Sequence, residues 1–237
     1  MTLPFFHIPD YEHDGKQLLL DESTSRHIVQ VLRMKEGEQL HLTDGKGILF
    51  TAAITKADKK KCIVKVLESQ SSPGPGKKFS IGISLLKNTN RFEWFLEKVT
   101  EIGIYEIIPL LCDRTEKQHF RFERMNQICI SAMLQSKQTW LPKLHQPISF
   151  ELFFRQEELN SIEKKFIAHC EQGEERPALR SFAPFSSSLI LIGPEGDFTM
   201  QEIKLATSHG FRPVSLGETR LRTETAGVAA AVVLCLT

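Results

Sequence analysis

Two glycine-containing segments in the last third of the chain have residue types and spacing suited to binding a ligand. The first is Ile-Gly-Pro-Glu-Gly-Asp-Phe at 192–198, and the second, at 216–227, contains Arg220 and Arg222. Glycine lets backbone amides and carbonyls approach a ligand closely. Each segment follows a short apolar run, and open α/β sheets bind ligands outside the carboxyl ends of their strands. Because consecutive strands are usually neighbours in a sheet, we expect the two segments to form one pocket.

Each segment also has a simpler structural interpretation. Gly193 and Gly196 could serve turn geometry alone, Arg220 and Arg222 could be solvated loop charges, and the small residues at 226–231 suit a closely packed helix. No Gly-x-Gly-x-x-Gly opens a βαβ unit and no Gly-x-x-x-x-Gly-Lys occurs, which disfavours the common nucleotide-binding enzymes. The eight histidines and five cysteines show no metal-ligand spacing and no Cys-x-x-Cys. We therefore expect no metal and a reducing compartment.

Strands alternating with helices must position these segments. Apolar runs typical of buried strands occur at 79–86, 104–111, 165–169, 189–192 and 213–216. Helical spacing occurs between and after them, at 91–102, 122–137, 199–209 and 224–236. Thr199 and Glu202 have the spacing of a capping box, and Gly103 is a typical helix end. This alternation predicts a mostly parallel α/β sheet.

The first 70 residues have a different pattern. Short strands are predicted at 16–20, around Leu40 and Leu42, at 48–54 and at 62–67, with a tight turn at 44–47. One helix, capped by Ser23 or Ser25, presents the apolar stripe Ile28, Val29 and Leu32. These elements predict a small β-barrel. A Ser-, Pro- and Gly-rich run then separates the two regions, so we expect domains at 1–70 and 79–237 with a linker at 71–78.

Composition sets the broad class. The 237 residues are 41% hydrophobic and 25% charged with a formal net charge of +1, which is typical of a folded globular protein. Any nucleic-acid binding must therefore come from local basic patches and not from bulk charge. The start of the chain lacks the pattern of a signal peptide, and the longest apolar stretch, 226–236, is short for a membrane span. We expect a cytoplasmic protein with no membrane partner.

The two segments together resemble a known family. Leu-Ile-Gly-Pro-Glu-Gly at 191–196, Leu-Gly at 216–217 and Leu-Arg-Thr-Glu-Thr-Ala at 221–226 resemble the paired signature of the SPOUT-class 16S rRNA (uracil-N3)-methyltransferases, the ribosomal RNA small subunit methyltransferase E type. Further similar stretches cover nearly the whole chain in order, at 27–34, 44–47, 87, 91–94, 98–103 and 107–110.

The resemblance implies a fold and a set of partners. It implies an α/β protein in which a PUA-like β-barrel RNA-binding domain precedes a SPOUT methyltransferase domain with a trefoil knot. It further implies S-adenosyl-L-methionine as cofactor, 16S ribosomal RNA or the small ribosomal subunit as substrate, and a homodimer with its site at the subunit interface. The implied cofactor-binding residues are Leu191, Ile192, Gly193, Pro194, Glu195, Gly196, Leu216, Gly217, Leu221, Thr223, Thr225 and Ala226.

Methylation at N3 of uracil makes two demands on side chains. The N3 proton must leave, so a cation should stabilise the negative charge on the ring and a carboxylate should accept the proton. Arg222 is our candidate for the cation, and Glu224 or Glu195 for the acceptor, although Glu224 also suits a helix start. N3 lies on the pairing edge, so the base must be unpaired. The candidate RNA contacts are Arg26, Arg33, Lys59–Lys61, Lys87, Arg91, Arg114 and Lys117.

The sequence departs from the family pattern at four places, one of them a dipeptide. Asp197 stands where the family often has a second glycine, Glu218-Thr219 where it often has Pro-Arg, and Asn88 where it has glycine. Gln138 stands where it commonly has an arginine, whose role could pass to Lys137 or Arg114. The departures at Asp197 and Gln138 keep open a catalytically inactive RNA-binding protein of the same fold. The missing phosphate loops disfavour a different nucleotide-using α/β enzyme.

Overall fold

A computed structural model describes residues 3–9, 17–116, 119–171 and 176–236. Lys117 and the first residue of the strand expected at 16–20 lie outside these ranges. The chain forms two compact units. Unit 1 comprises 1–74 with Met133–Leu141, and unit 2 comprises 75–132 with 142–237. The segment at 133–141 thus belongs with the N-terminal unit although it lies far along the chain.

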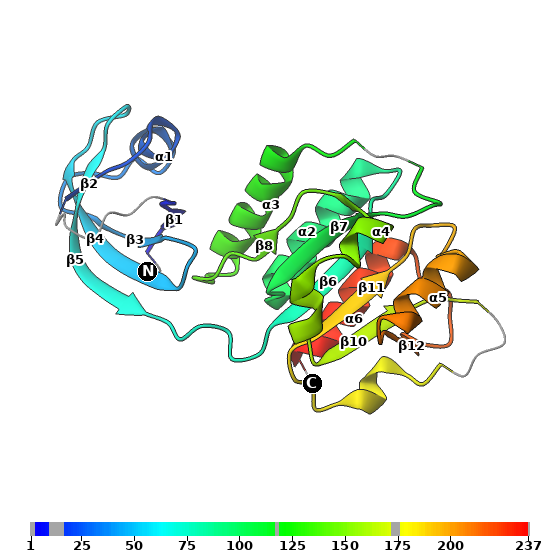
Figure 1. Cartoon of the computed structure of the whole chain (residues 1–237). Helices are drawn as coiled ribbons and strands as arrows, with labels where there is room; N and C mark the ends of the chain where they lie inside the picture. Colours follow the sequence, from blue (N-terminus) through cyan, green and yellow to red (C-terminus); the bar gives the residue numbers. More distant parts are fainter. Residues whose placement is uncertain (1–2, 10–16, 117–118, 172–175, 237) are drawn as a thin grey trace. The chain divides into compact units, whose positions relative to one another are not determined.

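Unit 1 is a curled sheet of five strands in the order β1-β3-β4-β5-β2 (Figure 1). Its strands are β1 Phe5–His7, β2 Gln17–Leu19, β3 Gln39–Thr43, β4 Ile48–Lys56 and β5 Ile63–Ser71. Neighbours are antiparallel except β1 and β3, and two register shifts in β4 bend the long β4–β5 pair. Among the described residues the edge strands β1 and β2 do not pair with each other. The expected barrel is therefore an open half-barrel.

The helix of unit 1 is capped two residues before Ser23 and four before Ser25, the two predicted caps. α1 is Glu22–Arg26, and its cap is Asp21, whose carboxylate accepts a hydrogen bond from the Thr24 amide at 3.0 Å. Neither Ser23 nor Ser25 is the cap. Ser25 is buried, and its hydroxyl donates to the Leu20 carbonyl and accepts from the Cys62 amide, so it fastens the helix to the sheet. A π-helical turn follows α1 directly and extends to Val31.

The segment Met133–Leu141 packs against the predicted turn at 44–47. Gly47 has φ of +102°, and a Cβ there would lie 2.4 Å from the Trp140 ring, so only glycine fits. The Gly47 amide donates to the Thr139 carbonyl at 2.9 Å, and the Leu141 amide donates to the Gly45 carbonyl at 2.9 Å. Unit 1 therefore needs a segment that the sequence places after residue 130.

Unit 2 has the predicted parallel sheet, in the order β12-β10-β11-β6-β7-β8 with β9 also paired to β7. Its strands are β6 Phe79–Ser84, β7 Glu106–Leu111, β8 Lys143–Leu144, β9 Ile148–Ser149, β10 Lys164–Ala168, β11 Ser188–Ile192 and β12 Arg212–Val214. The sequence did not predict β8 and β9, which are only two residues long. β10 lies between β11 and β12, so the expectation that consecutive strands would be neighbours is wrong here.

Helices cover both faces of this sheet. They are α2 Thr89–Ile102, α3 Phe122–Gln135, α4 Phe150–Phe153, α5 Met200–Ser208 and α6 Thr223–Leu236, with 3-10 turns at Glu157–Ser161 and Leu179–Phe182. The predicted capping box of Thr199 and Glu202 is present at α5, and Gly103 ends α2 in the left-handed region with φ of +95°. No helix in the described ranges has both the length and the apolar character needed to cross a bilayer.

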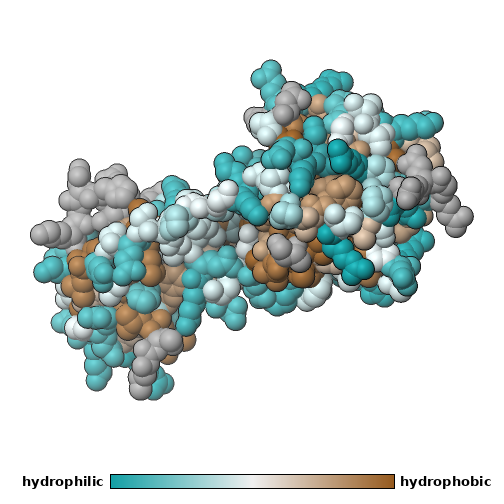
Figure 2. Space-filling view, turned by 90° about the horizontal axis from the view of Figure 1, so that it is seen from below, coloured by the Kyte–Doolittle hydropathy of each residue, from teal (hydrophilic) through white to brown (hydrophobic). Residues whose placement is uncertain are grey.

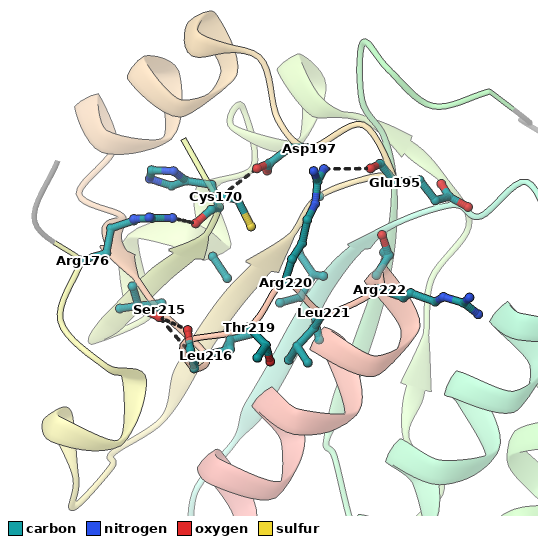
Figure 3. A pocket seen from close by; sticks show the side chains of 18 of the residues that line it. Cys170, Arg176, Glu195, Asp197, Ser215, Leu216, Thr219, Arg220, Leu221 and Arg222 are labelled. Carbon is teal, nitrogen blue, oxygen red and sulfur yellow. Dashed lines mark hydrogen bonds between the residues drawn. The ribbon is translucent and has the colours of Figure 1, made fainter. Parts of the chain in front are cut away.

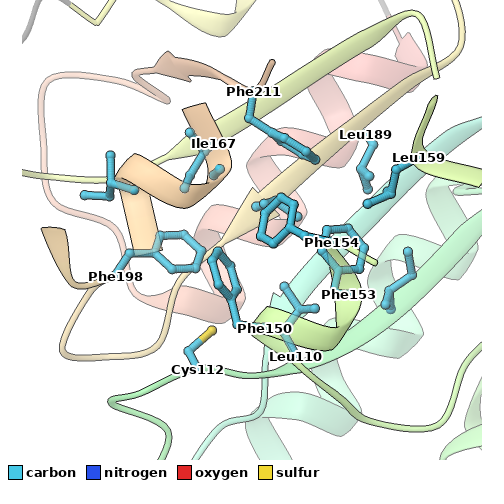
Figure 4. Close-up of a cluster of buried hydrophobic side chains, with 14 residues drawn as sticks. Leu110, Cys112, Phe150, Phe153, Phe154, Leu159, Ile167, Leu189, Phe198 and Phe211 are labelled. Carbon is cyan, nitrogen blue, oxygen red and sulfur yellow. The ribbon is translucent and has the colours of Figure 1, made fainter. Parts of the chain in front are cut away.

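Two different kinds of packing hold the layers. On one face, α4 and α5 enclose a core rich in aromatic rings, shown in Figure 4, with Phe150, Phe153, Phe154, Phe198 and Phe211. On the other face, α6 crosses α2 so closely that a Cβ at Gly227 would lie 2.5 Å from the Phe95 ring and 3.1 Å from Ile83. The small residues of α6 therefore permit a close approach between helices.

The surface of the protein mixes polar and apolar residues, as Figure 2 shows. Large apolar side chains that remain exposed are Leu19, Val31, Leu32, Leu67, Trp94, Leu152, Met200, Val232 and Leu236. Exposed apolar residues are normal on a protein surface. Trp94, Val232 and Leu236 are notable because they belong to α2 and α6, which pack against each other.

Candidate functional site

A pocket of about 450 Å³ opens at the carboxyl ends of β10, β11 and β12 (Figure 3). These three strands are adjacent in the sheet, so the loops that follow them meet at one edge. The residues that line the pocket are Ala168, His169, Cys170, Arg176, Ile192, Gly193, Pro194, Glu195, Asp197, Val214–Leu221, Arg222, Thr223 and Ala226. Both glycine-containing segments thus contribute to one pocket even though their strands are not neighbours.

The loop after β11 is shaped by close contacts. A Cβ at Gly193 would lie 3.0 Å from the Phe198 ring and 3.1 Å from the Phe198 amide nitrogen, which leaves little space for a side chain. Arg114 supports the same loop from outside, because its Nη1 donates to the Gly196 carbonyl at 2.7 Å. Arg114 is thus the candidate that contacts the pocket loop, whereas Lys137 belongs to the segment of unit 1.

The loop after β12 is closed by its own side chains. The Ser215 hydroxyl donates to the Gly217 carbonyl at 2.8 Å and accepts from the Gly217 amide at 3.2 Å. Gly217 has φ of +151°, a conformation that favours glycine. Further along, Arg220 extends over the pocket and its Nη2 lies 3.5 Å from the Glu195 carbonyl (Figure 3). This long contact connects the loops of β11 and β12.

The loop after β10 supplies residues that sequence reasoning missed. Arg176 donates to the His169 carbonyl, and the Cys170 amide donates to Asp197 Oδ2 at 2.7 Å (Figure 3). The sequence did contain an indication of this third loop. The strand at 165–169 was predicted, and in a parallel sheet its carboxyl end lies at the same edge as the carboxyl ends of β11 and β12. It was overlooked because this loop has no glycine motif.

The expected cofactor residues separate into two groups. Those that line the pocket are Ile192, Gly193, Pro194, Glu195, Leu216, Gly217, Leu221, Thr223 and Ala226. Leu191, Gly196 and Thr225 do not line it. Leu191 is fully buried in the aromatic core beside Gly82, and Thr225 is exposed on the first turn of α6.

The three candidate catalytic residues have different surroundings. Arg222 lines the pocket, is exposed, and in Figure 3 points to the side opposite Arg176. Glu195 is exposed at the rim. Glu224 does not line the pocket; its side chain is only 8% exposed and its Oε1 lies 3.6 Å from Nε of Arg91. Its buried Oε2 has no hydrogen-bond partner among the described residues.

Several candidate RNA contacts already interact with protein acceptors. Arg26 pairs with Glu22 at 2.7 Å, and Lys87 pairs with Glu116 at 2.6 Å. Both pairs are well exposed, where ion pairs contribute little, so these cations can exchange partners with phosphate at small cost. Arg33 is exposed in the left-handed region with φ of +56°, two residues after the end of the π-helical turn. Lys59–Lys61 are exposed in a turn. The described residues contain no cluster of three or more His, Cys, Asp or Glu suited to a metal ion.

Comparison with known proteins defines the class. Residues 74–235 match the model of an RNA methyltransferase domain, and residues 20–67 match that of an RNA methyltransferase PUA domain. The protein is therefore an RNA methyltransferase with an N-terminal PUA domain, and the N-terminal half-barrel and C-terminal parallel sheet correspond to these two parts.

The particular family follows from its relatives. The chain is 30% identical to ribosomal RNA small subunit methyltransferase E of Bacillus subtilis over 84% of its length and 82% of the relative. It is 28% identical to the same protein of Rickettsia conorii, over 92% and 88% of the two chains. The chain belongs to the ribosomal RNA small subunit methyltransferase E family.

Solved structures agree with this assignment. A crystal structure of a probable rRNA methyltransferase from Porphyromonas gingivalis is 38% identical, with a TM-score of 0.87 over 97% of this chain and 95% of that one. The methyltransferase E of Neisseria gonorrhoeae, solved with bound S-adenosyl methionine, is 29% identical with a TM-score of 0.80 over 98% and 96% of the two chains.

Proposed function

We propose that this protein transfers a methyl group from S-adenosylmethionine to N3 of an unpaired uridine in 16S ribosomal RNA. The observation that carries the proposal is the pocket in which the loops of β10, β11 and β12 meet, at the edge of a parallel sheet where such folds bind their ligands. Family membership gives the reaction class, and the resemblance of 191–196 and 221–226 gives the atom.

The pocket suits S-adenosylmethionine in size and chemistry. Its volume of about 450 Å³ lies in the range of small-molecule sites, roughly 300–1,000 Å³. Gly217, at which a Cβ would meet nothing within 4 Å, leaves the backbone accessible to a nucleoside. Arg176 and Arg220 could hold a carboxylate, and Glu195 and Asp197 could accept hydrogen bonds from ammonium or hydroxyl groups. When bound, the cofactor supplies a methyl group on a sulfonium centre, which needs no further activation.

The remaining task falls to side chains at the rim. Arg222 stabilises the negative charge that develops on the uracil oxygens. Glu195 accepts the N3 proton, because it lines the pocket while its carboxylate stays exposed. Glu224 is the weaker candidate, since it is buried away from the pocket and pairs with Arg91. We assign Glu224, in the first turn of α6, to holding the Arg91 side chain of α2 in place.

The PUA domain and the basic residues around the pocket hold the RNA. Arg26, Arg33 and Lys59–Lys61 on unit 1, and Lys87, Arg91 and Arg114 on unit 2, contact phosphates and position the RNA. Along the sequence, domains at 1–70 and 79–237, joined by a linker at 71–78, are part of the proposal. The protein acts in the cytoplasm, where its ribosomal substrate is assembled.

Two further features of the family are proposed for this chain. A homodimer is supported by the exposed Trp94, Val232 and Leu236 on the packed helices α2 and α6. A trefoil knot is supported by the path of the chain after β12. This strand lies at the edge of the sheet, and the chain after it passes the loops of β10 and β11. It then forms α6, which packs against α2.

Replacement of one arginine tests the reaction. Arg222→Ala should reduce methyl transfer to 16S ribosomal RNA by about 100-fold or more, the usual effect of removing one charge-stabilising group. Calorimetry should show unchanged S-adenosylmethionine binding, and Arg180→Ala, at an exposed position that does not line the pocket, should leave both quantities unchanged. RNA binding by the unaltered protein without cofactor binding would instead support the inactive alternative. An unchanged set of methylated uridines in ribosomal RNA from cells lacking the protein would contradict the assignment.

A further inference from the structure

We infer that Asp197 is a positioning residue that fixes the shape of the cofactor pocket by joining the loop after β11 to the loop after β10. The inference deepens the proposed function and rests on it, because it concerns the same pocket. It identifies a role for a side chain that the family pattern does not lead one to expect, since Asp197 is one of the departures noted above.

The backbone of Asp197 explains which residues this position accepts. Its φ is +66°, in the left-handed region, where aspartate, asparagine and glycine are tolerated far better than other residues. The Asp197 amide donates to the Pro194 carbonyl at 2.9 Å and closes the turn. Oδ1 of its carboxylate accepts from the Phe198 amide at 2.8 Å, which fixes the side chain in one orientation.

The second carboxylate oxygen connects the loops. The parallel pairing of β10 and β11 ends at Ala168 and Ile192, so backbone pairing no longer holds the chains together beyond that point. Two residues past the end of β10, the Cys170 amide donates to Asp197 Oδ2 at 2.7 Å (Figure 3). Asp197 therefore extends the connection between the two strands into the pocket wall.

This link is stronger than the contact on the other side of the β11 loop. Each contact has one charged partner, but Nη2 of Arg220 lies 3.5 Å from the Glu195 carbonyl, whereas the Cys170 amide lies only 2.7 Å from Asp197 Oδ2. Charge-assisted hydrogen bonds are about twice as strong as neutral ones. Cys170 and Asp197 both line the pocket, so loss of the link would release one wall of the site.

Three variants separate the link from the backbone geometry. Asp197→Gly keeps the left-handed conformation and removes both acceptors, and Asp197→Asn keeps the conformation with one oxygen in place of two. Asp58→Gly is the matched control, because the Asp58 carboxylate also accepts two backbone amides, from Lys60 and Lys61 at 2.8 and 3.0 Å, in unit 1.

The first measurement is the affinity for S-adenosylmethionine by calorimetry. In parallel, kcat and the KM for S-adenosylmethionine are measured for methyl transfer to 16S ribosomal RNA. We expect Asp197→Gly to weaken S-adenosylmethionine binding about 10-fold, the effect of losing one charge-assisted hydrogen bond, with an increase in KM and nearly unchanged kcat. Asp197→Asn should fall between Asp197→Gly and the unaltered protein, and Asp58→Gly should bind like the unaltered protein. Unchanged affinity in Asp197→Gly would overturn the inference.

The second measurement needs no cofactor. Amide hydrogen exchange of the full chain, followed by NMR, should show that the Cys170 amide is protected in the unaltered protein and exchanges faster in Asp197→Gly. Weaker cofactor binding with unchanged Cys170 protection would overturn the inference, because the loss of affinity would then have another origin. Failure of the unaltered protein to bind S-adenosylmethionine would defeat the proposed function, whereas the Cys170 amide would still report on the link itself.

Discussion

At the scale of single residues, the pocket depends on small side chains as much as on charged ones. Gly193 sits against the ring and the backbone of Phe198, and Phe198 is itself buried in the aromatic core. The backbone at Gly193 therefore lies between the pocket and the aromatic core, with little space for a side chain. Glu224, in contrast to Gly193, does not line the pocket: its carboxylate is buried and pairs with Arg91.

A methyl group added at Gly193 should impair the pocket. Its Cβ would lie 3.1 Å from the Phe198 amide nitrogen, and because a backbone atom cannot rotate away, the loop must shift. We expect Gly193→Ala to weaken S-adenosylmethionine binding at least severalfold in calorimetry. Gly76→Ala, where a Cβ meets nothing within 4 Å, is the control. Equal affinity in Gly193→Ala and the unaltered protein would refute this prediction.

Glu106 makes stability depend on pH. Burial tends to raise its pKa, but hydrogen bonds from His145 at 2.7 Å and Ser80 at 2.9 Å outweigh burial and hold the pKa below its ordinary 4.5. A carboxyl with a lowered folded pKa stabilises the protein above its unfolded pKa and loses this contribution as pH falls through the folded pKa.

Glu106→Gln should therefore lower the free energy of unfolding by about 1–2 kcal/mol at pH 7. The difference from the unaltered protein should shrink as the pH falls below 4.5. Urea unfolding at several pH values measures it, with the exposed Glu22→Gln as control. A difference independent of pH would show that the carboxylate charge is not responsible.

At the scale of elements, the position of α6 depends on its contact with α2. Gly227 lies over Phe95 and Ile83, at a distance that no larger residue permits without movement. α6 begins at Thr223, immediately after the second pocket segment. The packing of the two helices therefore determines where Arg222 and Thr223 enter the site.

Enlarging this contact should destabilise unit 2. Gly227→Ala places a Cβ 2.5 Å from the Phe95 ring, and overpacking of this kind costs about 1–3 kcal/mol. Chemical denaturation measures the loss, and Phe95→Leu in the same chain should recover part of it by freeing space. A purely additive double mutant would contradict direct contact as the cause.

At the scale of the whole molecule, the chain forms two units that are not contiguous in sequence. The segment Met133–Leu141 returns to unit 1 and places Trp140 over Gly47, while the pocket lies entirely within unit 2. We therefore expect the stability of unit 1 to be separable from cofactor binding in unit 2.

Removal of the tryptophan tests that separation. Trp140→Ala should destabilise unit 1 by about 3 kcal/mol, the usual loss for truncating a large packed ring, and leave S-adenosylmethionine affinity unchanged. Hydrogen exchange measured by mass spectrometry should show faster exchange in β3 and β4, with the strands around the pocket unaffected. An equal loss of protection in both units would mean that they unfold together.

Much of the fold was predictable because its signals are local. The capping box of Thr199 and Glu202, the end of α2 at Gly103 and the apolar strands β6, β7 and β11 each depend on neighbouring residues in the sequence. The cap of α1 was wrong by a few residues, because Ser25 serves the sheet and Asp21 takes the cap. The pocket was predicted from its two glycine segments, but its third side, at His169, Cys170 and Arg176, carried no motif.

The sequence alone determined most helices, most strands and the two segments that meet at the pocket, since hydrophobic periodicity, caps and glycines act over a few residues. Only the tertiary structure decided that β10 separates β11 from β12, that residues 133–141 complete unit 1, and that Asp197 joins two loops. Such contacts join residues that are far apart in the sequence. They depend on how the entire core packs, which no pattern of neighbouring residues determines.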